Sequence, residues 1–248
     1  SSGGLGFGIA EALAKEGADV ILTGRNDEKL KGCASRINAA KNGCADYISA
    51  DLSDELWCAK IVKKIKKDLG TIDILIANTG GPPPGTIVGV DINIARRHLE
   101  MMLLRVAEIT NFVILGMREK GWGRIVTVAS SGIQQPIPNL ALSNMIRSAL
   151  VGWSKSVANE VANSGITCNI LVPGRIHTNR VDIIDAANAD KLGCSIEEVR
   201  QASFSTIPIG RYGTVEEFSS TAAFLSSCQA SYITGSIIRC DGGIIKSV

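Results

Sequence analysis

Several features that would point away from an ordinary folded domain are scarce in this sequence. The net charge is only +2 over 248 residues, and a balance of this kind argues against nucleic-acid or polybasic membrane contacts. No apolar run approaches 18 residues, so no membrane span is predicted, and we expect no secretion signal. Aromatic residues make up just 4%, but 45% of the chain is hydrophobic, which excludes disordered, collagen-like and coiled-coil classes.

Paired cysteines are also missing. The seven cysteines are odd in number and none forms a C-x-x-C pair, so they predict neither a disulfide framework nor a zinc site. We expect them to be small buried hydrophobic side chains in the reducing cytoplasm, and we expect no metal in the protein.

What the sequence does have is an alternation of strand-like and helix-like segments. Short apolar runs cover residues 19–23, 47–50, 72–77, 124–128, 166–172 and 236–239. Helical patterns cover about 6–15, 27–40, 54–70, 93–120, 141–163 and 214–225, with a mixed, partly helical stretch at 178–207. Strands that are apolar on both faces predict a parallel sheet covered by helices on each side. We therefore expect one α/β domain over residues 1–248, a Rossmann-type doubly wound sheet.

A glycine-rich segment, residues 3–8 (Gly-Gly-Leu-Gly-Phe-Gly), leads directly into the first helix. Small residues let the backbone approach a pyrophosphate, and a helix N-terminus offers it unpaired N–H groups. Glycine clusters also form ordinary turns, but the helix and strand that follow favour dinucleotide binding.

The end of the next strand concerns the choice of coenzyme. Folds that prefer NAD place an acidic residue there to hold the ribose, whereas this sequence has Gly24 followed by Arg25. A guanidinium can bind a 2′-phosphate through two hydrogen bonds, which favours NADP over NAD. The alternative is that Arg25 is a solvated loop residue.

Six segments in chain order match the motifs of one enzyme family: residues 1–8 (Ser-Ser-Gly-Gly-Leu-Gly-Phe-Gly), 51–52 (Asp-Leu), 77–80 (Ala-Asn-Thr-Gly), 123–126 (Gly-Arg-Ile-Val) leading to Ser130, 173–178 (Pro-Gly-Arg-Ile-His-Thr) and 241–243 (Asp-Gly-Gly). Over essentially its whole length the chain resembles the short-chain dehydrogenases/reductases, in particular the 3-oxoacyl-carrier-protein-reductase-like branch. This resemblance also implies a further, central strand before Ser1.

The resemblance implies coenzyme-binding roles for particular residues. Those that would contact the dinucleotide are Ser2, Gly4, Gly6, Phe7 and Gly8 at the pyrophosphate, Asp51 and Leu52 at the adenine, Asn78 and Gly80 near the adenosine ribose, and Pro173, Gly174 and Thr178 beside the nicotinamide, with Arg147 at the ribose hydroxyls. It also implies a substrate lid over residues 178–207 and a homotetramer or homodimer.

The catalytic positions depart from the family's pattern of a serine, a Tyr-x-x-x-Lys pair and a helix asparagine. Ser130 fits the serine, but thirteen positions further on stands Ser143, and four beyond it Arg147. The asparagine aligns approximately with Met102. We therefore take Ser130, Ser143 and Arg147 as the candidate catalytic residues.

These replacements change the proton chemistry. A tyrosine hydroxyl starts at a pKa of roughly 10 and a nearby cation lowers it further, whereas a serine hydroxyl is a far weaker acid. Arginine keeps the positive charge but does not relay a proton by losing one. Other candidate groups are His177, as a proton donor, and Asn144, which could orient a substrate; His98 is expected to be structural or exposed to solvent.

Two functions stay open at this point. The first is an oxidoreductase that transfers a hydride between NADP(H) and a small carbonyl or secondary-alcohol substrate, with a 3-oxoacyl thioester as one candidate. The second is a catalytically degenerate nucleotide-binding sensor, scaffold or partner subunit. Both predict coenzyme binding without a nucleic-acid or membrane partner, and they differ in turnover.

Overall fold

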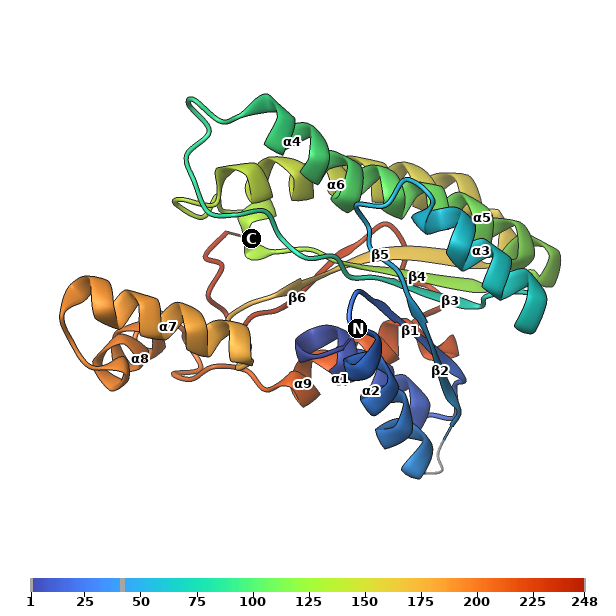
Figure 1. Ribbon diagram of the computed structural model, residues 1–248, viewed down its shortest axis with the longest axis horizontal. Helices are drawn as coiled ribbons and strands as arrows, with labels where there is room; N and C mark the ends of the chain where they lie inside the picture. Colours follow the sequence, from blue (N-terminus) through green and yellow to red (C-terminus); the bar gives the residue numbers. More distant parts are fainter. Residues whose placement is uncertain (1, 41–42, 248) are drawn as a thin grey trace.

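The computed structural model describes residues 2–40 and 43–247 (Figure 1). Its strands are β1 (Val20–Gly24), β2 (Ala45–Ser49), β3 (Ile74–Ala77), β4 (Gly123–Val128), β5 (Ile166–Pro173) and β6 (Ile237–Cys240). Its α-helices are α1 (Gly4–Lys15), α2 (Asp27–Ala39), α3 (Trp57–Asp68), α4 (Ile92–Leu99), α5 (Arg105–Lys120), α6 (Ala141–Val161), α7 (Asn179–Leu192), α8 (Ile196–Phe204) and α9 (Val215–Leu225). The predicted alternation is confirmed.

All strand pairs are parallel, and helices cover both faces of the strands. On β4, Ile125 packs into the core beneath α3, α5 and α6, whereas the next residue, Val126, packs into the core formed with α1 and α9. Both side chains are fully buried, as expected for a strand between two helical layers. The parallel α/β fold is therefore confirmed.

Within the described residues the parallel strands form two hydrogen-bonded groups. One has the order β1-β2 and the other β3-β4-β5-β6, and in the described part of the chain no strand pairs with the facing edges of β1 and β3. The break falls where the resemblance implies a further central strand. The helices α1 and α9 pack together across it.

Several helix boundaries differ from the predictions for local reasons. The first helix begins at Gly4 instead of Gly6, so the glycine-rich segment is already helical. The third begins at Trp57, because the Asp54 carboxylate accepts a hydrogen bond from the Leu56 amide and pairs with Lys60 before the helix starts. The predicted cap at Thr214 is confirmed: its hydroxyl accepts from the Glu217 amide in a capping box.

The long helix predicted over residues 93–120 is interrupted. A π-helical segment, Glu100–Leu104, separates α4 from α5, and such segments are frequent at functional sites. Met102, in its centre, is fully buried against Leu142 and Ile146 of α6.

The mixed stretch at 178–207 folds as two helices, α7 and α8, which project away from the sheets (Figure 1). We call residues 179–204 the α7–α8 arm. Among the helices in residues 2–40 and 43–247, none has the length and apolar character needed to cross a membrane.

Candidate active site

A cavity of about 2680 Å³ opens at the carboxyl ends of the strands. Its wall combines the start of α1, the loop after β3, the end of β4, the start of α6, the end of β5 and one side of α7. Ligand pockets usually measure about 300–1,000 Å³. This one is larger because its lining continues past Leu13 of α1 and Ile74 of β3 to Cys228 and Gln229, beyond the end of α9.

The start of α1 forms one end of the cavity. Ser2, Gly4, Gly6, Phe7 and Gly8 all line it, whereas Ser1 lies outside the described residues. The N-cap is Gly3, which has no side chain to occupy the first amides, so they are available to an anion.

Gly8 has a second role that the sequence did not reveal. A Cβ atom at this position would lie 2.2 Å from Cγ1 of Val215 and 2.7 Å from Oγ of Ser219, both on α9. Only a glycine permits this close approach of α1 and α9, which holds the start of α1 in place.

The end of β5 and the loop after it form an adjoining wall, through Pro173, Gly174 and Thr178. A Cβ atom on Gly174 would lie 2.5 Å from Cα of Asp241, so the two motifs 173–178 and 241–243 pack directly on each other. Thr178 approaches α1, with its methyl group 3.8 Å from where a Cβ on Gly4 would be.

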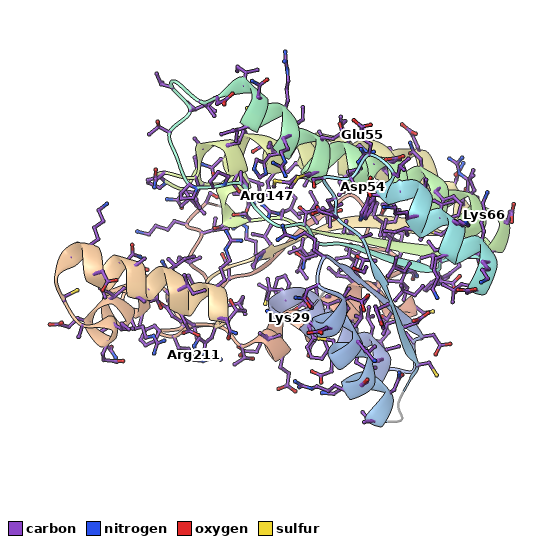
Figure 2. All side chains as sticks on the ribbon, viewed as in Figure 1. Lys29, Asp54, Glu55, Lys66, Arg147 and Arg211 are labelled. Carbon is purple, nitrogen blue, oxygen red and sulfur yellow. The ribbon has the colours of Figure 1, made fainter. Side chains whose placement is uncertain are left out.

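Arg147 is a buried cation held by backbone carbonyl groups. Its Nη1 donates to the carbonyl oxygens of Val128 at 3.0 Å and Ala129 at 3.3 Å, and its Nη2 to that of Thr79 at 3.4 Å. Figure 2 shows it between α6 and the four-stranded sheet. Burial, and secondarily the charge of Arg180, lowers the pKa of Arg147 to about 10, so the side chain remains charged at neutral pH. This arginine joins the end of β4 to the loop after β3.

Ser130 and Ser143 line the same cavity as Arg147 and are half-buried. Ser130 follows β4 and its hydroxyl accepts a hydrogen bond of 3.2 Å from the Gly132 amide, whereas Ser143 lies in the first turn of α6. Met102, which is predicted to align with the family's asparagine, is fully buried and does not line the cavity. The structure therefore brings the three candidate catalytic residues to one cavity.

Asn144 does not line the cavity, which argues against the predicted contact with a substrate. Its amide group brackets Ile137, accepting from the backbone N–H at 3.3 Å and donating to the backbone oxygen at 3.0 Å. It fixes the loop between Ser130 and α6.

Only some of the residues predicted to contact the adenosine part of the coenzyme line the cavity. Asn78 and Gly80 line the cavity, but Arg25, Asp51 and Leu52 do not. The Asp51 carboxylate accepts from the Ser53 amide at 2.9 Å, and this hydrogen bond, together with the charges of Arg25 and Arg97, lowers its pKa. Their roles stay predictions.

Sequence reasoning missed Lys29, which lines the cavity from α2 (Figure 2). Lys29 is a cation in the first turn of this helix and is a further candidate for binding a phosphate group. The signal was available, because Lys29 follows Arg25 by only four positions.

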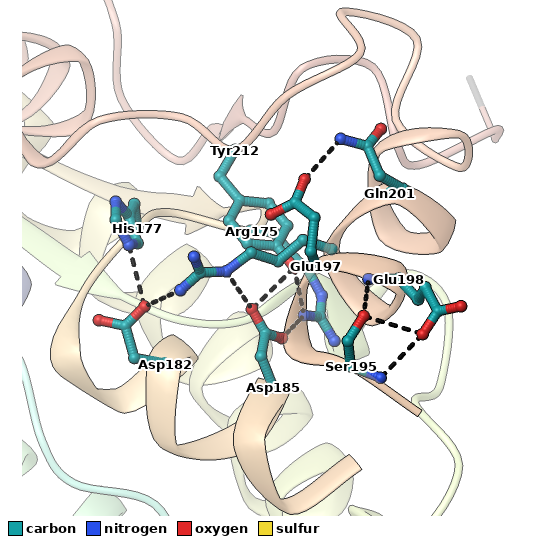
Figure 3. Close-up of polar contacts among 10 residues, drawn as sticks. Arg175, His177, Asp182, Asp185, Ser195, Glu197, Glu198, Gln201 and Tyr212 are labelled. Atoms are coloured by element: carbon teal, nitrogen blue, oxygen red, sulfur yellow. Dashed lines mark hydrogen bonds and ion pairs between the residues drawn. The ribbon is translucent and has the colours of Figure 1, made fainter. Parts of the chain in front are cut away.

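A polar cluster anchors the α7–α8 arm (Figure 3). The fully buried carboxylate of Asp185 accepts hydrogen bonds from Arg175 at 2.9 Å and from the Tyr212 hydroxyl at 3.0 Å. Nearby, Asp182 contacts His177 Nε2 at 2.9 Å and Arg200 at 2.7 Å. His177 thus lines the cavity, and its ring is held by Asp182 of the α7–α8 arm.

His98 is half-buried on α4, in agreement with a structural role. In the described part of the chain its Nδ1 has no hydrogen-bond partner, and burial lowers its pKa.

Comparisons with known proteins agree with this architecture. A family described as Enoyl-(Acyl carrier protein) reductase matches residues 1–245. NADPH-dependent reductase BacG of Bacillus subtilis is 31% identical over 250 residues, covering 100% of this chain and 96% of the relative. The 3-oxoacyl-[acyl-carrier-protein] reductase FabG of Escherichia coli is 30% identical over 246 residues, covering 98% and 94%.

Solved structures give the same result. YwfH, an NADPH-dependent reductase involved in bacilysin biosynthesis, superposes with a TM-score of 0.94 at 29% identity, covering 100% of this chain and 96% of that one. L-sorbose reductase from Gluconobacter frateurii, solved with NADPH and L-sorbose, gives 0.95 at 28% identity, covering 100% and 95%.

The fold and the site thus define an oxidoreductase that transfers a hydride. More closely, the chain belongs to the short-chain dehydrogenase/reductase family, in agreement with the resemblance seen in its motifs.

Proposed function

We propose that this chain reduces a carbonyl compound to an alcohol, using Ser130, Ser143 and Arg147 at the positions of the family's serine, tyrosine and lysine. The observation that carries the proposal is the buried guanidinium of Arg147, which lies at the end of β4 on the wall that both serines share. The coenzyme is NADP(H), which supplies the hydride for the carbonyl carbon.

The backbone of the chain fits such a coenzyme. The amides at the start of α1 take the pyrophosphate, because Gly3 leaves them uncapped and small residues flank them. Arg25 and Lys29 take the 2′-phosphate. The remaining contacts are those of Asp51 and Leu52 with the adenine, of Asn78 and Gly80 with its ribose, and of Pro173, Gly174 and Thr178 with the nicotinamide.

The side chains then act on the substrate oxygen. The hydroxyls of Ser130 and Ser143 donate hydrogen bonds to the carbonyl oxygen, and Arg147 offsets the negative charge that develops there. Because serine is a far weaker acid than tyrosine, hydride transfer leaves an alkoxide, which takes its proton from water in the open cavity. The two hydroxyls orient this water, and bulk solvent neutralises the hydroxide that remains. Met102 leaves this route without a further polar group from α4 or α5.

The rest of the chain supports this site. Residues 1–248 act as one domain, and residues 178–207 form a lid over the substrate, anchored through Asp185. The substrate is a small carbonyl or alcohol compound, with 3-oxoacyl thioesters as one candidate. The protein is a homotetramer or homodimer, and Leu104, Leu115 and Met145, exposed by 47, 60 and 46%, offer apolar surface for such contacts.

A turnover assay tests the proposal. Loss of NADPH absorbance is followed with a panel of ketones and 3-oxoacyl thioesters, for the wild type and for Ser130→Ala. We expect turnover by the wild type and a loss of about 10²-fold in kcat for the variant, with NADPH affinity little changed. An unchanged kcat would remove Ser130 from the reaction.

A second candidate function is nucleotide binding without turnover, in a sensor, scaffold or partner subunit. The buried Met102 favours it, because it places a methionine where the family's pattern has an asparagine. The double variant Ser143→Tyr/Arg147→Lys separates the two functions. If the wild-type site is active, the double variant should reduce ketones at an unchanged or lower rate. If the wild type is inactive and the double variant gains strong activity, the protein is a disabled enzyme.

A further inference from the structure

Arg180 lies on the wall of the proposed active site and belongs to no motif used so far. It is the second residue of α7, its side chain is exposed, and it lines the cavity together with Ser143 and Arg147. Its Nη2 atom lies 3.5 Å from the place that a Cβ on Gly81 would occupy. Arg180 therefore reaches from the α7–α8 arm across the cavity to the loop after β3.

The electrostatics around Arg180 favour an anion. Its charge is close enough to Arg147 to help lower the pKa of that buried guanidinium. It also stands in the first turn of α7, where the helix dipole is positive and a cation is unfavourable. Two guanidinium groups and a helix N-terminus thus converge on one side of the cavity, and a bound anion would offset their repulsion.

The neighbouring cations are already paired, whereas Arg180 is not. Arg175 is paired with Asp185, and His177 with Asp182, as Figure 3 shows. No carboxylate forms an ion pair with Arg180 or Arg147 within residues 2–40 and 43–247. The glutamates that line the cavity are elsewhere, on α1 (Glu11), just after it (Glu16) and on α9 (Glu216).

The position of Arg180 favours the substrate over the coenzyme as the source of this anion. The proposed phosphate contacts lie at the start of α1 and at Arg25 and Lys29, whereas Arg180 belongs to α7, in the arm that is proposed to cover the substrate. The next cavity-lining residues of α7 include the apolar side chains of Ile183, Ile184 and Ala187. A ligand with one carboxylate on an apolar body would match this wall.

We propose, building on the reductase function above, that the substrates are oxo acids and that Arg180 binds their carboxylate while the carbonyl lies at Ser130 and Ser143. In the reaction the carbonyl carbon accepts a hydride from NADPH, which becomes NADP⁺, the C=O π bond breaks, and the oxygen takes a proton from water, leaving a hydroxide ion that bulk solvent neutralises. The carboxylate is unchanged by the reaction. It orients the substrate through a charge-assisted, two-point contact.

The kinetic test uses one ketone with and without the charge: 2-oxo-4-phenylbutanoate and its ethyl ester. Wild-type protein should prefer the acid in kcat/KM by about 10-fold or more, the usual effect of a hydrogen bond to a charged group. Arg180→Gln should lose this preference through a higher KM for the acid, with the ester and kcat little changed. The matched control, Lys191→Gln, removes a cation about three turns further along α7 and should keep the preference.

A binding test is independent of turnover. Calorimetry measures 4-phenylbutanoate and the neutral 4-phenylbutanamide, which cannot be reduced, on NADPH-saturated wild type and on Arg180→Gln. The carboxylate should bind about 10-fold more tightly than the amide to the wild type, and equally to the variant. If carboxylate binding follows this pattern but no ketone is reduced, the anion site stands and the reductase function fails.

Two results would overturn the proposal. One is equal binding and equal kcat/KM for the charged and neutral compounds with the wild type. The other is a loss of NADPH affinity in Arg180→Gln as large as the loss of carboxylate affinity, since the arginine would then bind a phosphate of the coenzyme.

Discussion

The two sides of the cavity differ in the kind of atoms that they offer to a ligand. At the start of α1 and at the end of β5 the wall is mostly backbone, with glycines where neighbouring chain segments approach most closely. At α6 it consists of the side chains of Ser143 and Arg147, with Ser130 contributed by the end of β4. The backbone side carries the glycines of the predicted coenzyme motifs, whereas the side-chain side carries Ser143 and Arg147, which are predicted to replace the family's tyrosine and lysine. Backbone atoms bind a ligand in much the same way whatever the side chains, provided that a few glycines are kept. Catalysis depends on particular side chains, so single substitutions can change it.

The largest effect is expected from removing the central charge of the side-chain half. Arg147→Met should lower kcat by about 10²–10³-fold, because no cation then offsets the charge on the substrate oxygen. The loss in NADPH affinity should be much smaller. Arg147→Lys, which keeps the charge, is the control and should retain most of the activity; steady-state kinetics with circular dichroism of the folded variants provide the measurement. If Arg147→Met keeps the wild-type kcat, the charge of Arg147 does not take part in the reaction.

The backbone half can be broken by a single methyl group. In Gly8→Ala the new Cβ would meet Val215 and Ser219 at 2.2 and 2.7 Å, so α1 must move away from α9. We expect a loss of about 1–3 kcal/mol in the free energy of unfolding, together with weaker NADPH binding.

Gly152→Ala on α6 is the matched control for this variant. Nothing lies within 4 Å of its added Cβ, and alanine favours the helix by about 1 kcal/mol, so chemical denaturation should show equal or greater stability. Equal stability of Gly8→Ala and the wild type would show that α1 is not held by this contact.

A smaller effect is expected on the preference for NADPH over NADH, which differ by the 2′-phosphate. Arg25→Ala should weaken NADPH binding by about 10-fold and leave NADH binding nearly unchanged, since only NADPH carries the additional phosphate. Lys29→Ala should give a smaller effect in the same direction. Fluorescence titration of both variants with both nucleotides measures this, and equal losses for NADPH and NADH would discard the assignment.

The smallest effect is expected from pH, because kcat should hardly change over the neutral range. Arg147 is charged below its pKa of about 10, and neither serine titrates near neutrality, so kcat should be constant from roughly pH 6 to 9 and fall as the pH rises through about 10. A tyrosine-dependent site would instead show an ionisation closer to neutral pH. A break near neutrality that disappears in His177→Gln would transfer the proton step to that histidine.

The sequence predicted most of the backbone half. Glycines and the residues that cap helices act locally, so Thr214 and the glycine-rich start of α1 could be recognised from a few neighbouring residues. The same local signals misplaced the start of α3, because Asp54 binds Leu56 and Lys60 ahead of the helix instead of capping its first turn.

Contacts between distant segments could not be predicted in this way. The amide of Asn144 serves Ile137, and the carboxylate of Asp185 is held by Arg175 and Tyr212, which become neighbours only through the fold. The π-helical segment around Met102 leaves no periodic signal strong enough to distinguish it from a continuous helix. Arg180 was missed for the same reason, since its neighbours across the cavity, Gly81 and Arg147, are far away in the sequence.

The most direct test of the account is a fluorescence titration of the wild-type protein with NADPH, followed by displacement with NADP⁺. We expect saturable binding to one site per chain, weakened in Gly8→Ala and nearly preserved in Ser143→Tyr/Arg147→Lys. Absence of saturable binding, or a loss in the double variant as large as in Gly8→Ala, would contradict the claim that the coenzyme is held at the start of α1 and not by the side chains of Ser143 and Arg147.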